Sequence, residues 1–458
     1  MKALPQPLMI SGRHQAFKEW PYLIAILLGA LALRSWFVLG GWVGAPFISD
    51  ATQYGNYAWN LVHAHTFSMA DPGSESVVPD NYRDPGYPLL LAGLMLLFGS
   101  GDAWYHSILL VQVILGALSA GLAFVISRHW LGRNASFFVG MAVAVWPHNM
   151  AISDFLLSET LFGFMVLLAL WLLVSASGSA RRLRWGLAGL GFGAAAMVNA
   201  TMTPFGLLLA AALCLKRLAP SRLLLAFLIG SLLLPGAWAV RSLTLKSDVS
   251  AGNRVTENLV QGSWPIYHSA FKAFPFDAQA AHVMDTIHED TALANKSLVA
   301  WSAKLLERVE REPGKYLAWY AWKPELLWAW NIRVGFGDVY PYPIAHPIFS
   351  SSVVMRVFEA LCVALDPVLF VLMAVAAGVV LFRSEASKVS IGLYAAALLI
   401  AFETLVYSVL QSEPRYSIPF RPLQMMLVAA AIEWAWRRWQ AGRRAMRSSP
   451  MPAGEQGL

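Results

Sequence analysis

The chain carries the uncharged run PYLIAILLGALAL at residues 21–33 and a second one, PVLFVLMAVAAGVVL, at residues 367–381. Such runs recur through all 458 residues, in a composition with 57% hydrophobic and 13% charged residues. Long uncharged segments are uncommon in soluble proteins. They are typical of membrane proteins, because a helix that crosses a bilayer needs about 20 predominantly apolar residues. The sequence therefore predicts an all-α integral membrane protein, built mostly as one bundle.

Ten apolar runs alternate with short polar connections, and they predict a bundle of about ten transmembrane helices. The runs lie at residues 21–42, 104–127, 135–147, 156–175, 185–200, 203–216, 221–240, 353–382, 389–410 and 418–436. With ten crossings, the short Arg and Lys clusters between the runs all fall on one face, which the positive-inside rule makes cytoplasmic. These scattered clusters account for the net charge of +7, so we expect no nucleic-acid partner.

Two segments decide this count. Residues 87–98 are too few to span a bilayer, and we interpret them as a surface helix on the outer side. The run at 185–215 is interrupted at residues 199–204, and we interpret it as a hairpin of two short helices.

The predicted organisation follows from this topology. It consists of a cytoplasmic N-terminus at 1–20, a transmembrane module at 21–240 with a first outer loop at 43–103, a large helical outer loop at 241–352, C-terminal transmembrane helices at 353–436 and a basic cytoplasmic tail at 437–458.

The first outer loop contains a compact polar passage that begins with Ser49 and Asp50. In such an apolar chain, acidic residues and arginines just outside a membrane helix indicate a functional site. Asp50, Tyr54 and Tyr57 follow i, i+4, i+7 spacing, so a helix there would bring them to one face. The alternative is that Asp50 or Ser49 only caps that helix.

Further charged residues lie on the same predicted side. Arg83 and Asp84 precede a Pro-Gly-Tyr-Pro turn, and their alternative interpretation is a local ion pair. Asp154 and Glu159 lie at the outer entrance of the helix predicted at 156–175, where the helix dipole alone favours an acid.

The second outer loop has two further features. An amphipathic helix is predicted at 277–309, ended by the Glu-Pro-Gly sequence at 312–314. The tryptophan-rich stretch at 316–330 is interpreted as an interfacial aromatic belt, with a sugar-stacking or lipid-binding face as the alternative.

Six short motifs occur in a fixed order along the chain. They are DxxxYxxxAxNL at 50–61, RxPGYPL at 83–89, SE at 158–159, WAVR at 238–241, REPGKYL at 311–317 and EPRYxxP at 413–419. In this order and on this topology, the chain resembles the bacterial GT-C glycosyltransferases, in the branch similar to protein O-mannosyltransferases and to lipid A aminoarabinose or galacturonic acid transferases. The resemblance covers most of the chain.

The resemblance implies an enzyme in the bacterial cytoplasmic (inner) membrane with its active site facing the periplasm or the outside. It would move a hexose or pentose from a polyprenyl-phosphate donor to a lipid, glycan or protein acceptor. The module at 21–240 would be catalytic, Asp50 would be the catalytic aspartate, and Asp154 and Glu159 would belong to the site or bind a divalent metal cation. The family's short-helix loop often carries a basic residue where this chain has Asn199.

The residue types suit this chemistry. A hydroxyl acceptor is a poor nucleophile, and a positioned carboxylate such as Asp50 can act as its general base. The lipid phosphate that leaves needs cations, and the candidates are Arg83, Arg241 and Arg415. The remaining predicted donor-binding residues are Tyr54, Tyr57, Asp84, Tyr87 and Tyr416.

The main alternative is a membrane transporter or flippase of a lipid-linked sugar. Such proteins place charged residues near the bilayer midplane, in broken helices related by repeats. The candidate charges here instead gather on one face, and this pattern favours the transferase.

Overall fold

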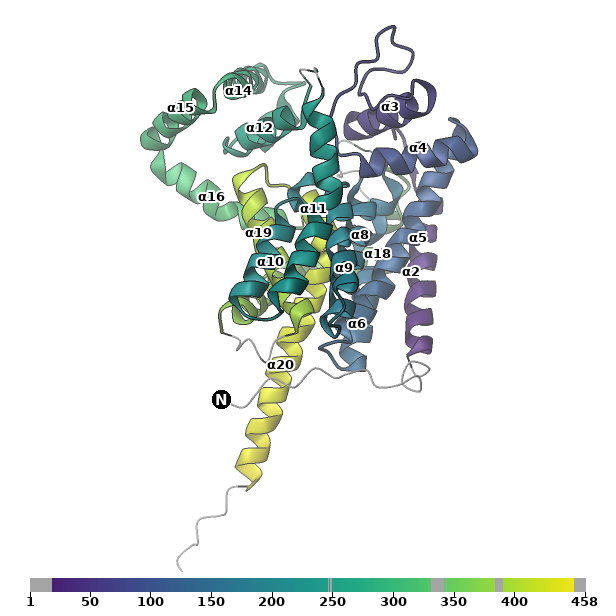
Figure 1. Ribbon diagram of the computed structural model, residues 1–458, viewed down its shortest axis with the longest axis vertical. Coiled ribbons are helices and arrows are strands. Elements are labelled where there is room, and N and C mark those ends of the chain that lie inside the picture. Colours follow the sequence, from purple (N-terminus) through teal and green to yellow (C-terminus); the bar gives the residue numbers. More distant parts are fainter. Residues whose placement is uncertain are drawn as a thin grey trace, which may run out of the picture.

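The computed structural model describes residues 19–245, 247, 249–330, 342, 344–383 and 390–448. Each of the ten predicted apolar runs contains a helix of the bundle (Figure 1). These helices are α2 (Trp20–Gly40), α5 (Asp102–Ser127), α6 (Arg133–Val145), α8 (Glu159–Ser177), α9 (Arg182–Ala196), α10 (Phe205–Leu215), α11 (Ser221–Leu243), α18 (Val353–Gly378), α19 (Ile391–Val409) and α20 (Arg421–Ser448). The predicted all-α membrane architecture is confirmed.

Fewer than ten of these helices are long and apolar enough to cross a membrane by themselves. Within the described residues, six meet that criterion, namely α2, α5, α8, α11, α18 with its extension to Phe382, and α19. A seventh span is possible if α6 is joined to α7 (Pro147–Ala151) and η1 (Ile152–Asp154), which follow it after a 56° bend. Helices α9 and α10 are short, and α20 carries charged residues at Arg421 and from Glu433 onward.

The expected break inside residues 185–215 is present. Helix α9 ends at Ala196, and Asn199 then caps the short helix η2 (Ala200–Met202) by accepting a hydrogen bond from the Thr201 backbone N–H at 3.1 Å. Helix α10 begins after Pro204. The chain therefore forms two short helices there instead of one long span.

Helices α3 (Ser49–His63) and α4 (Gly86–Phe98) lie across one end of the bundle (Figure 1). Helix α4 buries Tyr87 and Leu91 while its last turn leaves Leu96 and Leu97 more than two-thirds exposed. A short helix with one buried face and an exposed apolar end fits the surface helix that the sequence predicts.

The described part of the segment between α11 and α18 is mostly helical, and its helices α12, α14 and α15 lie at the same end of the bundle as α3 (Figure 1). Its elements are α12 (Ala251–Gly262), α13 (Tyr267–Ala273), α14 (Ala278–Lys296), α15 (Leu298–Arg311), α16 (Pro313–Trp328) and α17 (Ile348–Ser351). One short antiparallel strand pair, β1 (Trp42–Val43) with β2 (Ile344–Ala345), joins its last part to the end of α2.

The prediction of one helix over 277–309 is wrong, because the chain turns at Ser297. The Ser297 backbone is extended, and its hydroxyl accepts a hydrogen bond from the Ala300 N–H at 3.2 Å, which begins α15. Asp277 caps α14 in the same way, with its carboxylate 2.7 Å from the Gln279 N–H. Both caps supply acceptors that the first turn of a helix otherwise lacks.

The tryptophans of α16 do not form a belt around the outside. Trp319 and Trp328 are buried, and their indole N–H groups donate to the Gly262 carbonyl at 2.9 Å and the Thr404 hydroxyl at 3.0 Å. Among the three tryptophans of this helix, Trp322 alone is exposed, at 45%. Most of the aromatic stretch therefore fastens α16 to its neighbours.

Candidate active site

Asp50 lies in the first turn of α3, where Ile48 with its extended backbone precedes the helix. Its Oδ1 accepts a hydrogen bond from Arg83 Nη2 at 2.5 Å, and its Oδ2 accepts one from Arg415 Nη2 at 2.7 Å. Both carboxylate oxygens are thus engaged by guanidinium groups. The capping alternative for Asp50 does not describe what this side chain does.

The two arginines extend the interaction into a row of alternating charges. Arg415 Nε lies 3.0 Å from the Glu159 carboxylate at the start of α8, which gives the order Arg83, Asp50, Arg415, Glu159. We call these residues the four-charge chain. Their side chains are between 9% and 21% exposed, so the charges are largely withdrawn from water and balance one another.

The arginines set the protonation of Asp50. Burial alone would raise the pKa of this carboxyl, but the guanidinium groups of Arg83 and Arg415 hold its pKa well below the usual range. The acids in turn raise the pKa of Arg415 despite its burial. Asp50 is therefore ionised but is a weak base while both guanidinium groups remain on it.

Asp84 is not the partner of Arg83. Its two carboxylate oxygens each lie 2.9 Å from Arg254 Nη2 of α12, and Oδ2 also accepts a hydrogen bond from the Ala200 N–H at 3.0 Å. The alternative interpretation, in which Arg83 and Asp84 form a local ion pair, is therefore wrong. Asp84 instead joins the first outer loop to α12 and to the break between α9 and α10.

Gly86 makes the second contact with that break. Its N–H donates to the Met197 carbonyl at 2.7 Å, and a Cβ at this position would lie 2.8 Å from the same oxygen and 2.7 Å from Val198 Cγ2. Only glycine permits this approach without a shift of the backbone. Residues 86–88, which the sequence predicts as part of a turn, are instead the start of α4, and this start is held against the break three residues after Arg83.

Three of the predicted tyrosines surround the four-charge chain. The Tyr54 hydroxyl donates to Ser158 Oγ at 3.3 Å, and the Arg83 guanidinium lies 5.1 Å from its ring centre. Tyr87 contacts Tyr54 edge to face at 5.0 Å. The ring of Tyr416 lies 5.5 Å from the Arg415 guanidinium. These rings restrict the directions in which the two arginines can move.

Tyr57 and Arg241 meet at a different residue, Asp80. The Tyr57 hydroxyl donates to the Asp80 carboxylate, and Arg241 Nη1 donates to the Asp80 carbonyl at 2.6 Å. Arg241 also lies 4.5 Å from the Trp238 ring centre. The described contacts of Arg241 therefore hold the first outer loop, and its role as a phosphate ligand stays a prediction.

The prediction of a metal site concerns Asp154 and Glu159, and these two side chains have different contacts in the structure. Glu159 is paired with Arg415, whereas Asp154 in η1 is buried with Oδ2 lacking a hydrogen-bond partner. The described part of the chain contains no group of three or more His, Cys, Asp or Glu side chains arranged for a metal ion. The divalent cation predicted at these two acids therefore stays a prediction.

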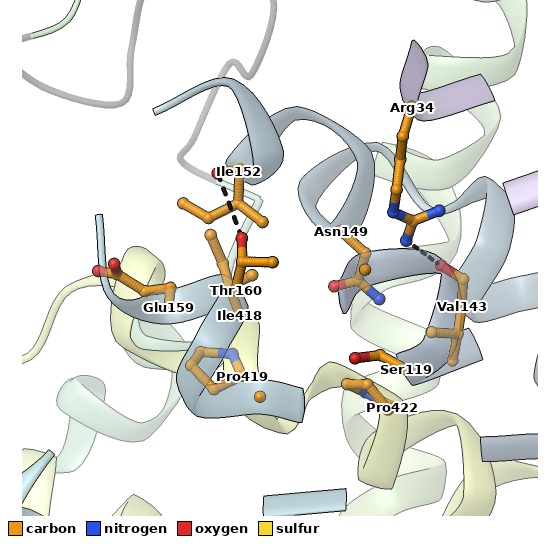
Figure 2. A pocket seen from close by; sticks show the side chains of 12 residues that line it. Arg34, Ser119, Val143, Asn149, Ile152, Glu159, Thr160, Ile418, Pro419 and Pro422 are labelled. Carbon is orange, nitrogen blue, oxygen red and sulfur yellow. Dashed lines mark hydrogen bonds between the residues drawn. The ribbon is translucent and has the colours of Figure 1, made fainter. Parts of the chain in front are cut away.

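A small cavity adjoins Glu159 inside the bundle (Figure 2). Its volume is about 30 Å³, which suits about one water molecule and no sugar. Figure 2 shows the Glu159 carboxylate on the opposite side from Arg34 of α2, which donates to the Ala144 and Val143 carbonyls at 3.0 and 3.1 Å. Arg34 thereby donates hydrogen bonds to the last carbonyl groups of α6, just before the 56° bend that leads into α7.

Sequence reasoning missed several residues of the site. Gln53 accepts a hydrogen bond from Arg83 Nε at 2.6 Å, and its position three residues after Asp50 could have revealed it. Tyr342 accepts from the Ala51 N–H at 3.2 Å and donates to the Ile48 carbonyl at 3.0 Å. Tyr342 holds the start of α3 from far along the chain, and no local pattern indicates that.

Residues 79–238 match the family model of the dolichyl-phosphate-mannose-protein mannosyltransferases. The matched stretch contains the motifs that begin at Arg83 and Ser158. Over these residues, the match supports the predicted resemblance to the protein mannosyltransferases. No curated protein sequence matches the chain.

Two solved structures align with most of this chain. The archaeal oligosaccharyltransferase AglB from Archaeoglobus fulgidus, in complex with an inhibitory peptide and a dolichol-phosphate, aligns with 96% of this chain and 53% of its own at 13% identity and a TM-score of 0.46. ArnT from Cupriavidus metallidurans, bound to undecaprenyl phosphate, aligns with 91% of this chain and 77% of its own at 14% identity and a TM-score of 0.36. The chain thus spans about half the length of the archaeal enzyme. At these identities and scores no residue role is carried over.

Proposed function

We propose that this membrane protein is a glycosyltransferase that moves a sugar from a polyprenyl-phosphate donor to an acceptor on the extracytoplasmic side of the cytoplasmic membrane. The observation that carries the proposal is the engagement of Asp50 by two guanidinium groups, Arg83 at 2.5 Å and Arg415 at 2.7 Å. The family match at residues 79–238 supports the same class of reaction and of donor.

The donor phosphate would compete with Asp50 for the two arginines. A phosphate offers several oxygens to guanidinium groups, and such charge-assisted hydrogen bonds are among the strongest in proteins. Because Arg83 and Arg415 approach Asp50 from different segments, a phosphate that replaces the carboxylate can be held from two sides. The same replacement frees Asp50 and raises its basicity, so the base is activated when the donor is present.

The proposed reaction is a displacement at the anomeric carbon. The acceptor oxygen forms a bond to that carbon while the bond from the carbon to the phosphate oxygen breaks. The electron pair of the broken bond leaves with the phosphate, whose charge Arg83 and Arg415 stabilise, and the acceptor proton passes to Asp50. No step requires the predicted divalent cation.

The test is transfer of a radiolabelled sugar by the purified protein in detergent, beginning with polyprenyl-phosphate mannose as donor and a cell-envelope extract as acceptor. We expect label in the acceptor with wild-type protein and at least about 10²-fold less with Asp50→Asn. Detergent removes the two compartments that a flippase needs, so transfer there separates the two classes. Absence of transfer, together with movement of the donor across proteoliposomes by both proteins, would establish the flippase instead.

A further inference from the structure

A second and larger cavity lies among the helices between α11 and α18, and none of the four-charge chain lines it. Its volume is about 380 Å³, within the range of small-molecule sites. It is bounded by Trp264, Arg308, Arg311, Glu312, Lys315 and Tyr316, and we call it the outer pocket.

Three cations line the outer pocket, and two of them are loosely held. Arg311 is 77% exposed and lies 3.6 Å from Glu307, and Lys315 is 47% exposed and lies 2.9 Å from Glu312. Exposed ion pairs of this kind contribute little to stability. Both cations are therefore free to turn toward an anion that enters the pocket.

Arg308 and Trp264 form the rigid floor of the outer pocket. The Arg308 guanidinium lies 4.1 Å from the centre of the Trp264 ring and 3.0 Å from the fully buried Asp290 carboxylate. The same carboxylate accepts a hydrogen bond from the Trp264 indole at 3.2 Å. Asp290 thus fixes the indole and the guanidinium together, and Tyr316 adds a second, mostly buried ring.

An aromatic face beside several cations suits one chemical class of ligand. The apolar face of a sugar ring packs on an indole, here on the side of Trp264 that the Arg308 guanidinium does not cover, while a phosphate or carboxylate on that sugar binds guanidinium and ammonium groups. We propose that the outer pocket binds an anionic carbohydrate, that is, a sugar carrying a phosphate or a carboxylate. That this sugar is part of the acceptor rests on the proposed function.

The pocket is also joined to the segment that carries Arg415. The Gly262 carbonyl, just before Trp264, accepts a hydrogen bond from Lys323 Nζ at 2.8 Å. The same amine donates to the Leu410 carbonyl at 2.6 Å, where the short segment leading to Arg415 begins. Lys323 thereby links the chain next to Trp264 to the segment that leads to Arg415.

The direct test is calorimetric titration of the purified full chain with glucose 1-phosphate, glucose and inorganic phosphate, each at the same ionic strength. We expect glucose 1-phosphate to bind at least about tenfold more tightly than either component, a difference of about 1.4 kcal/mol. The double variant Arg311→Ala/Lys315→Ala should lose at least about tenfold in that affinity. The control Arg181→Ala/Arg182→Ala removes two exposed cations from the start of α9 and should bind as wild type.

Equal affinities of the two double variants, or glucose binding as tightly as glucose 1-phosphate, would overturn the outer pocket as an anionic-carbohydrate site. Inorganic phosphate binding as tightly as glucose 1-phosphate would overturn it as well, because the sugar would not be recognised. The titration contains no polyprenyl donor and no phospholipid, so its result is independent of catalysis. Failure of wild-type protein to transfer sugar would refute the proposed function while leaving the binding result intact.

Discussion

The role of general base proposed for Asp50 requires a basic carboxylate, whereas the guanidinium groups of Arg83 and Arg415 lower the pKa of this side chain. The conflict disappears if the donor phosphate takes over the arginines. Asp50→Asn should then keep donor affinity within about threefold of wild type, because Arg83 and Arg415 gain freedom, while turnover falls at least about 10²-fold. Donor titration and turnover measured on the same preparation check both halves. Loss of donor binding together with turnover would contradict the exchange.

Arg83 binds two partners at once, Gln53 through Nε and Asp50 through Nη2. A lysine keeps the charge but cannot make both contacts, so Arg83→Lys should lower kcat/KM for the donor by about tenfold or more. Arg128→Lys is the matched control, because Arg128 follows the last residue of α5 and pairs with Glu19, which precedes α2. Donor saturation curves of the three proteins provide the measurement. Superimposable curves for Arg83→Lys and wild type would remove Arg83 from the phosphate site.

The pH dependence of kcat/KM reports the donor-free enzyme. Because Arg83 and Arg415 hold the pKa of Asp50 below its usual range, wild-type activity should show no loss from this group as the pH falls to about 5. Arg83→Gln removes one cation, so the carboxyl pKa rises and activity is lost at a higher pH than in wild type. Profiles recorded from pH 4 to 8 check the direction. An acid limb that stays in place would show that Arg83 does not control Asp50.

The sequence predicted that Asp50 and Arg83 belong to one site, because both lie in the same polar passage outside the first helix. It also named Arg415 as a candidate. It could not predict that Asp50 joins these two arginines, because Arg415 is 365 positions away and the contact depends on how η5 (Pro414–Phe420) packs against α8. Spacing patterns describe one element at a time, whereas ion pairs between elements depend on tertiary packing.

At the scale of elements, glycine decides how the surface helix α4 meets the break between α9 and α10. Gly86→Ala should destabilise the protein by about 1–3 kcal/mol, since the new methyl group would lie 2.8 Å from the Met197 carbonyl oxygen. Gly93→Ala lies in the same helix with nothing within 4 Å of its Cβ, and it should be neutral or slightly stabilising. Thermal unfolding in detergent compares the two variants. Equal melting temperatures would show that the loop adapts at no cost.

Element positions were predicted better than element ends. Apolar periodicity and length identify the helices of the bundle, because burial in lipid or protein requires the apolar residues themselves. The break at Ser297 was missed because the amphipathic pattern continues on both sides of it, and only the serine hydroxyl acting as a cap marks the turn. The tryptophans of α16 were misread for a related reason, since an indole buried by neighbouring helices and one at the lipid surface look alike in sequence.

At the scale of the molecule, α3, α12, α14 and α15 share one end of the bundle (Figure 1). We predict that this end faces away from the cytoplasm. With Cys214 and Cys362 replaced by serine, cysteines introduced at Gly101 and Val249 should react with an impermeant maleimide in intact cells. A cysteine at Ser179, in the connection between α8 and α9, should react only after lysis. Labelling of Gly101 only after lysis would reverse the assignment.

The pairing of Asp50 with Arg415 also has a consequence for how the protein is made. Ribosomes deliver the chain from the N-terminus, so α3 with its carboxylate leaves the ribosome long before residue 415. Until then the arginine that completes the four-charge chain does not exist, and the nascent protein holds Asp50 without its second cation. A chain truncated before η5 would therefore insert into the membrane with an incomplete four-charge chain. The protein would become active only after residue 415 has been synthesised.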